Sequence, residues 1–251
     1  MNFLDVFIAF VLVSLCALLS WWKGHGQEKD LLIAAVRCIL QLTFLGYLLT
    51  WIFAHNQLII SLALAMVMTF NSALQSRSRV KGRYPGLLLD NLLATALSIW
   101  PMALVGSVML GGKNWWSVEN FLPFIGVLLG NSVNGISMGI DHFTQGMREK
   151  KEEVLEWLAL GANKIEATND IFRRSVKISL TPIMNSMMVF GIISIPGAMT
   201  GQILGGTSPM EAAITQMIIV LLIAVAVYLG VISGLVFARK RLFNKKGQLC
   251  L

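Results

Sequence analysis

Side chains that could coordinate a cation recur at helical spacing within apolar segments of this 251-residue chain. Asn131, Asn134, Met138 and His142 are three or four residues apart, which places them on one face of a helix. Amide oxygens suit harder metal ions, whereas the methionine thioether suits soft ions such as Cu(I). Because a transport site must also release its ion, the pattern favours loose coordination along a path.

Polar and sulfur-containing side chains interrupt other apolar segments as well. Met68, Asn71 and Gln75 share one helical face. Such residues either form hydrogen bonds between helices in lipid or line an ion path, and methionines also serve as packing material. The intramembrane polar candidates are Arg37, Gln41, Asp90, Asn131, Asn134 and Asn185. The candidate metal ligands are Met184, Met187, Met188 and His142.

Arg37 is a charged residue inside an apolar segment. It lies roughly 9 Å from the inner end of that segment, at 1.5 Å per helical residue. Its side chain either extends to the membrane surface or pairs with a carboxylate inside the bundle. Asp90 is the candidate partner.

The sequence predicts a transport subunit and not an enzyme. It contains no visible nucleophile–base pair, no compact cluster of His, Cys and carboxylates, and no metal-ligand set such as His-Glu-x-x-His. The nearest approach to a Walker A sequence, at residues 111–114, lacks the Ser or Thr. We therefore expect no cofactor bound by this chain, and any ATP to be bound by a partner subunit.

Apolar segments long enough to span a bilayer must position these side chains. The chain is 56% hydrophobic and only 13% charged, which excludes an ordinary soluble domain. The pattern predicts an all-α polytopic membrane protein with a single permease domain over residues 1–251. Seven spans are expected, at Phe3–Trp22, Leu31–Phe53, Leu58–Leu74, Leu87–Leu110, Phe121–Ile140, Ile178–Met199 and Ile214–Phe237.

Basic residues predict the orientation in the membrane. All Lys and Arg except Arg37 and Lys113 fall in the loops after spans 1, 3 and 5 or in the basic tail, residues 238–251. The positive-inside rule then puts the N-terminus outside and the C-terminus in the cytoplasm, for a protein of the bacterial inner membrane. This distribution accounts for the net charge of +7 without nucleic acid as a partner.

A cytoplasmic coupling region is predicted at about residues 143–177. Between Glu149 and Lys177 the sequence is densely charged, yet apolar residues recur along one helical side. A Gly-Ala pair near the middle permits a bend and close approach of another backbone. This pattern favours a long amphipathic helix that docks on a soluble partner; the alternative is a connector lying on the membrane surface. The coupling candidates are Glu156, Gly161, Ala162 and Glu166.

The run from Pro196 to Gly206 predicts a helix break at the outer end of span 6, because Pro removes a donor and Gly relaxes the backbone. Broken helices at membrane depth are tolerated where they line a cavity. The run is therefore either a plain loop or an outer gate whose carbonyls contact a leaving cation. The gate candidates are Pro196, Gly197, Met199, Thr200, Gly201, Gln202, Gly205 and Gly206.

Several of these segments resemble one permease family. Glu156, Gly161-Ala162 and Ile171 resemble the coupling motif of ABC permeases, although Glu156 precedes Gly161 by five residues where importers have six, and Arg173-Arg174 replace the importers' Leu-Pro. The runs 36–42, 181–188 and 194–209 resemble the FetB-type iron-export permeases, which are related to the plant aluminium-sensitivity permeases.

The resemblance covers essentially the whole chain and implies a function. It implies a homodimer of this permease in lipid, joined to a cytoplasmic ABC ATPase and exporting iron or a related metal ion. Three alternatives stay open: an ion carrier or channel that needs no ATPase, ABC export of a small organic solute, and a membrane scaffold that transports nothing.

Overall fold

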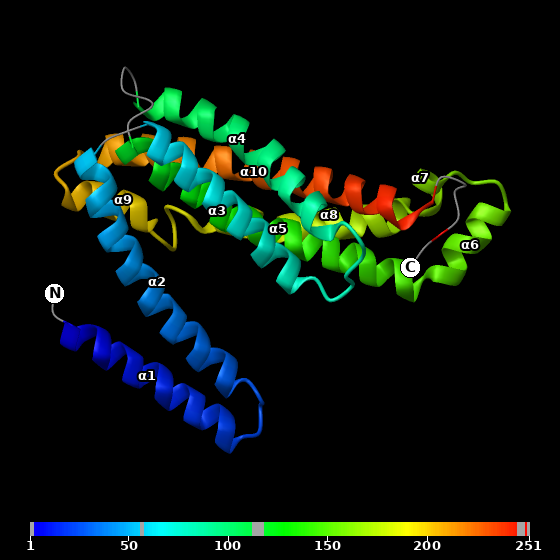
Figure 1. Cartoon of the computed structure of the whole chain (residues 1–251), viewed down its shortest axis with the longest axis horizontal. Coiled ribbons are helices and arrows are strands. Elements are labelled where there is room, and N and C mark those ends of the chain that lie inside the picture. The colour runs from blue at the N-terminus through cyan, green and yellow to red at the C-terminus, as the bar shows by residue number, and fades with distance from the viewer. Residues whose placement is uncertain (1–2, 56–57, 112–117, 245–248, 250–251) are drawn as a thin grey trace. The chain divides into compact units, whose positions relative to one another are not determined.

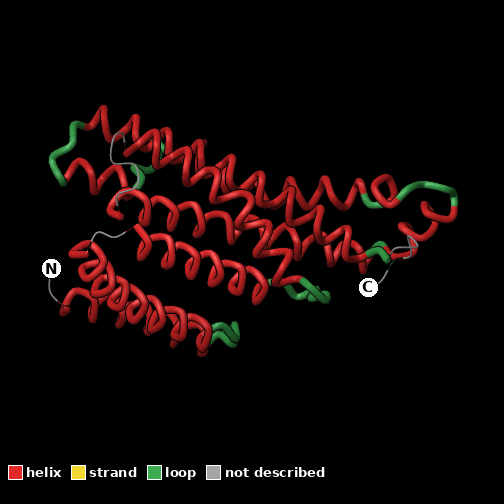
Figure 2. The backbone as a smooth tube through the Cα atoms, turned by 45° about the horizontal axis from the view of Figure 1, so that its top comes forward, coloured by secondary structure: helices red, strands yellow, loops and turns green. Residues whose placement is uncertain are grey.

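The computed structural model describes residues 3–55, 58–111, 118–244 and 249 as helices joined by short loops, with no strand in those ranges (Figure 2). Contacts divide the predicted single domain into two compact units, Met1–Asn56 and Gln57–Leu251. The first unit is a hairpin of α1 (Phe3–Trp22) and α2 (Glu28–His55). Gly24 and Gly26 in its turn have φ values of 70° and 71°, a left-handed conformation that glycine adopts without strain.

The second unit is built around one central helix. Its elements are α3 (Leu58–Arg79), α4 (Leu87–Gly111), α5 (Val118–Glu149), α6 (Lys151–Ala159), α7 (Lys164–Ala167), α8 (Asn169–Val189), α9 (Gly197–Leu204) and α10 (Pro209–Leu242). Helix α5 packs against α3, α4, α10 and α8 (Figure 1). Around α5, helix α3 packs on α4, α4 packs on α10, and α10 packs on α8.

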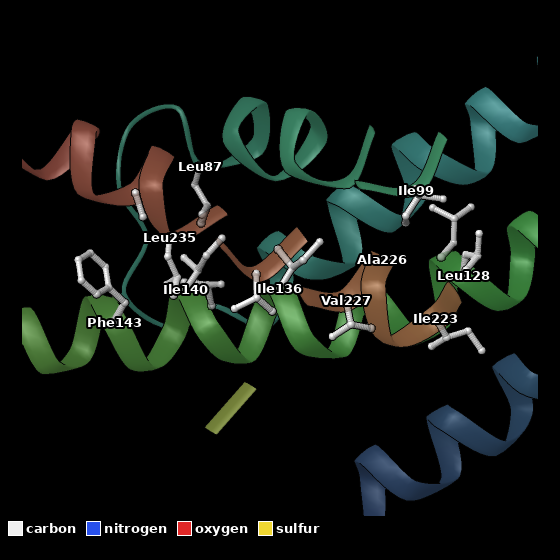
Figure 3. Close-up of a cluster of buried hydrophobic side chains, with 14 of the residues drawn as sticks. Leu87, Ile99, Leu128, Ile136, Ile140, Phe143, Ile223, Ala226, Val227 and Leu235 are labelled. Atoms are coloured by element: carbon white, nitrogen blue, oxygen red, sulfur yellow. The ribbon is translucent and has the colours of Figure 1, made fainter. Parts of the chain in front are cut away.

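The core fills the space between α5, α4 and α10. Ile136 and Ile140 of α5 lie among Leu87 of α4 and Val227 and Leu235 of α10, all buried (Figure 3). In lipid, apolar side chains gain little by leaving one apolar phase for another, so close packing holds such helices together. Small residues permit that packing: a Cβ on Gly135 would lie 2.7 Å from Val227 Cγ1, and one on Gly139 would lie 2.7 Å from Ser179 Oγ.

Replacing Gly135 with Leu should therefore destabilise the bundle. Overpacking a filled core typically costs about 1–3 kcal/mol, and here α5 would be forced from α10. Gly130→Leu is the matched control, because it lies on the same helix and a Cβ there meets nothing within 4 Å. Thermal unfolding in detergent, followed by circular dichroism, should show a lower midpoint for Gly135→Leu only. Equal midpoints would contradict this account of the α5–α10 contact.

Six described helices are long and apolar enough to cross a membrane: α1, α2, α3, α4, α5 and α10. The predicted span Ile178–Met199 is not a continuous helix. Helix α8 begins in the charged region at Asn169, runs back along α5, and ends at Val189 (Figure 1). A non-helical segment of residues 190–196 then leads to the short helix α9.

Candidate transport path and partner-binding segment

One side of α5 is left open by its four neighbours, and that side is polar. We call Asn131, Asn134, Met138, Asp141, His142 and Gln145 the polar stripe; each is exposed or half-buried. Apart from the adjacent Asp141 and His142, these residues follow one another at steps of three or four, as expected for one face of a helix, and the opposite face carries the buried Ile136, Ile140 and Phe143. The predicted grouping of Asn131, Asn134 and His142 on one face agrees with this geometry.

Hydrogen bonds hold part of the polar stripe in place. The Arg79 guanidinium donates to Asn134 Oδ1, and the Lys81 backbone N–H donates to Asp141 Oδ1 at 2.7 Å. Gln145 Nε2 donates to the other Asp141 oxygen at 2.9 Å. Interhelical hydrogen bonding, the alternative role considered for these residues, thus applies to Asn134. Asn131 differs, because its side chain donates to its own helix at Val127 O.

Polar side chains continue onto the helices that flank the stripe. Asn71 and Gln75 of α3 are exposed, as are Thr181 and Asn185 of α8. Asn71 Nδ2 donates to Val67 O within its own helix, so it does not bridge to α5. Polar groups facing hydrocarbon are costly, and in membrane proteins they usually face a protein interior or a water-filled cavity. The open side of α5 therefore needs a partner surface or water against it.

A groove of about 320 Å³ lies at one end of the polar stripe, between α5 and the first half of α8. Its lining includes His142, Gln145 and Glu149 on one side and Arg174 on the other. Lys150 at its rim forms ion pairs with Glu153 at 2.8 Å and with Asp170 at 3.6 Å. The hydrogen bond to Glu153 is the largest cause of a raised pKa for the Lys150 ammonium.

Helices α6 and α7 form a small projecting hairpin at the end of the unit where α5 and α10 end (Figure 1). The expected amphipathic helix from Glu149 to Lys177 is thus divided into α6, α7 and the start of α8. Gly161 takes a φ of 92° in the turn, so the break falls at the Gly-Ala pair. Asn163 and Glu166 form a capping box, in which Asn163 Oδ1 accepts from Glu166 N at 3.0 Å and Glu166 Oε2 accepts from Asn163 N at 2.8 Å.

The hairpin presents large apolar side chains to solvent. Val154 is buried against the core, whereas four other apolar residues of the hairpin are exposed. These are Leu155, Trp157, Leu160 and Ile165, which are 42%, 52%, 81% and 53% exposed. Among the coupling candidates, Glu156 and Gly161 are exposed, Ala162 is half-buried, and the Glu166 carboxylate is engaged in the capping box. An exposed apolar cluster on a charged segment suits contact with a protein partner or with the membrane surface.

The predicted gate residues lie in α9 and its flanks. The chain leaves α8 at Phe190, turns through Gly191 at a φ of 82°, and re-enters a helix at Gly197. The helix break therefore precedes the position expected from sequence: residues 197–204 are helical, whereas residues 190–196 are not. Thr200 donates to Pro196 O at 3.3 Å, and the second break comes at Gly206, with a φ of 96°. Met199 and Gln202 are half-buried; Gly201 and Gly205 are exposed.

Asp90, the predicted partner of Arg37, forms an ion pair within the second unit. Arg241 Nε of α10 lies 3.4 Å from Asp90 Oδ1, and Asp90 is only 3% exposed. Arg241 was not predicted as this partner because it was assigned to the basic tail, whereas α10 continues to Leu242. Burial, reinforced by the charge of Asp90, raises the pKa of the nearby Tyr84 phenol. Arg37 and Gln41 are exposed on α2 of the first unit.

The candidate metal ligands are dispersed. Met184 and Met188 are exposed on α8, His142 lies in the groove beside α5, and Met187 lines a cavity next to α9. Within the described residues, no three His, Cys, Asp or Glu side chains gather closely enough to hold a metal ion.

The fold defines an all-α polytopic membrane protein, with six described helices long and apolar enough to cross a bilayer. The chain belongs to the family described as "Uncharacterised protein family (UPF0014)", which it matches over residues 3–243. It is 32% identical to the UPF0014 membrane protein slr1647 of Synechocystis sp., over 91% of this chain and 88% of that protein.

Two relatives carry functional names. The "Probable iron export permease protein FetB" of Escherichia coli is 24% identical, over 96% of this chain and 92% of its own length. The "Protein ALUMINUM SENSITIVE 3" of Arabidopsis thaliana is 27% identical, over 96% of this chain and 87% of its own length. These matches confirm the expected resemblance to FetB-type and aluminium-sensitivity proteins. No solved structure matches the chain.

Proposed function

We propose that this protein is the permease subunit of an ABC transporter that exports iron or a related metal ion, with ATP hydrolysed by a separate cytoplasmic subunit. The name of the Escherichia coli relative supports the substrate and direction. The single observation that carries the ATPase partnership is the α6–α7 hairpin. It projects from the bundle and exposes Trp157 and Leu160 on a segment that is otherwise charged.

The hairpin suits mechanical coupling because it adjoins the groove beside the polar stripe. Lys150, at the start of the hairpin, pairs with Asp170 of α8, and Arg174 pairs with the same Asp170 at 3.1 Å. Both Lys150 and Arg174 line the groove beside the polar stripe. A push on α6 and α7 when ATPase subunits close would therefore be transmitted to α5 and α8 together.

The open side of α5 supports a homodimer. A second copy facing the same side would remove the polar stripe from lipid and enclose a polar path between the two copies. In this arrangement the α6–α7 hairpin and the C-terminal end of α10 face the cytoplasm, the N-terminus lies outside, and the protein resides in the bacterial inner membrane. The basic residues near Arg239 at the end of α10 agree with this orientation.

Metal efflux from cells tests the proposal. The chain is expressed with and without an ABC ATPase from the same organism, and cellular iron is measured after loading. We expect lower iron only when both proteins are present, with the effect lost when the catalytic Glu of the ATPase is changed to Gln. Transport by this chain alone in proteoliposomes would instead support an ATPase-independent carrier or channel. Unchanged iron with the two proteins still co-purifying would overturn the substrate and leave the ABC architecture.

A further inference from the structure

A cavity of about 550 Å³ lies where the end of α8, the non-helical segment after it, α9 and the first half of α10 meet. Three methionines from three separate helices line it: Met187 of α8, Met199 of α9 and Met217 of α10. The remaining lining is apolar apart from Gln216 of α10. Met199 and Met217 follow Met187 by twelve and thirty residues, and the break after α8 brings all three to one cavity.

The polar side chain in this lining, Gln216, offers an acceptor that suits a cation. Gln216 Oε1 is buried and accepts no hydrogen bond, so a lone pair is left without a partner. A buried acceptor without a partner is costly, which indicates that something else satisfies it. The lining contains no basic residue that would compete for this oxygen or repel a positive charge, and no acidic residue that would select a hard divalent ion.

Thioether sulfur determines which cation fits. Soft ligands such as methionine favour Cu(I), whereas oxygen ligands favour hard ions. Methionine side chains have three rotatable bonds, so three sulfurs lining one cavity can converge on a bound ion. We propose that Met187, Met199 and Met217 bind a soft monovalent cation, Cu(I) or its analogue Ag(I), with Gln216 Oε1 as an additional ligand. This site goes beyond iron export and lies at the end of α8 opposite the α6–α7 hairpin.

Silver binding to the purified full-length chain tests this site. The free thiols, including the exposed Cys16 and Cys38, are first blocked with N-ethylmaleimide because thiolates would also bind Ag(I). Bound silver is then measured by equilibrium dialysis and mass spectrometry, and its ligands by X-ray absorption. The test variant changes Met187, Met199 and Met217 together to Leu, a swap that nearly conserves volume and should keep the fold.

The matched control changes Met184, Met188 and Met210 to Leu, which are exposed methionines outside the cavity lining. We expect saturable Ag(I) binding with silver–sulfur scattering in wild type and control, and affinity weakened by at least about tenfold in the test variant. Circular dichroism confirms that each variant is folded.

Equal silver binding by the test variant and the control would overturn the site, as would no saturable binding to wild type. Retention of a lipid or other apolar molecule in wild type but not in the test variant, seen by native mass spectrometry without silver binding, would also overturn it. None of these measurements involves the ATPase or iron efflux, so failure of this site and failure of the proposed export function are distinguishable.

Discussion

Changing Leu160 to Asp is expected to abolish association with the ATPase and, with it, metal export, while leaving the permease folded. Leu160 is 81% exposed at the turn between α6 and α7, so its replacement removes no core contact. A central apolar anchor in an interface typically contributes at least about 2 kcal/mol, which is roughly a thirtyfold loss of affinity. Placing a carboxylate in that contact adds the cost of burying an unpaired charge.

Gly161 gives a less specific test of the same segment. A side chain there would meet nothing within 4 Å, but the φ of 92° is strained for any residue with a Cβ. A substitution such as Gly161→Trp would therefore combine backbone strain of roughly 1–2 kcal/mol with interference at the partner surface. Leu160→Asp separates the two effects, because Leu160 has a negative φ of −77°, with ψ 1°, so its replacement adds no left-handed backbone strain.

Leu204→Asp is the matched control for Leu160→Asp. Leu204 is 83% exposed, receives the same substitution, and lies at the end of α9, far along the chain from the hairpin. Co-purification of a tagged permease with its ATPase is measured for wild type and both variants, with size-exclusion chromatography as a check of folding. We expect the ATPase with wild type and with Leu204→Asp but not with Leu160→Asp. An ATPase retained by Leu160→Asp would refute the hairpin as the docking surface.

Sequence periodicity predicted the long apolar helices well because each is dominated by one constraint, the thickness of the bilayer. Helices α1, α2, α3, α4, α5 and α10 contain the predicted spans; α1 and α4 match them to within one residue, whereas α10 extends five residues further at each end. Sequence periodicity failed where one helix has to serve both a charged coupling segment and an apolar span. Helix α8 begins in the charged segment at Asn169 and ends at Val189, so its apolar part is shorter than a span and shares its length with the coupling region.

Long-range contacts were harder to predict than helical faces. The spacing of Asn131 and His142 showed that they share a face of α5, because that depends on local geometry alone. The pairing of Asp90 with Arg241 joins residues 151 positions apart and depends on how α4 packs on α10. Likewise, the exposed position of Leu160 results from the turn at Gly161. A prediction that assumes one continuous helix through residues 149–177 cannot show that position.

Substitutions at Asn131 should change metal export in an order set by charge. Asn131 is exposed on the polar stripe, and its amide donates only to Val127 O in its own helix, at 2.9 Å. Removing it therefore breaks no contact between helices. If a cation passes along the stripe, removing the Asn131 amide as a ligand should raise the barrier to transport by about 1.5–3 kcal/mol. The transport rate should then fall roughly tenfold to a hundredfold.

Three variants separate a ligand role from a packing role at this position. Asn131→Leu should reduce efflux, Asn131→Lys should abolish it by repelling the cation, and the nearly isosteric Asn131→Asp should retain or increase it. Thr43→Leu is the control, because Thr43 is an exposed residue of α2 whose hydroxyl also bonds only within its own helix, to Ile39 O at 2.8 Å. Efflux of loaded metal, normalised to the amount of folded protein, is the measurement.

Efflux and the state of the dimer, measured together, separate the two roles. A residue that only packs against a second copy would respond to size, so Asp would resemble Asn while Leu and Lys would be impaired together through loss of the dimer. A residue that faces a passing cation responds to the sign of the charge even when the dimer is intact. Wild-type efflux from Asn131→Lys, with the dimer preserved, would exclude the polar stripe from the path.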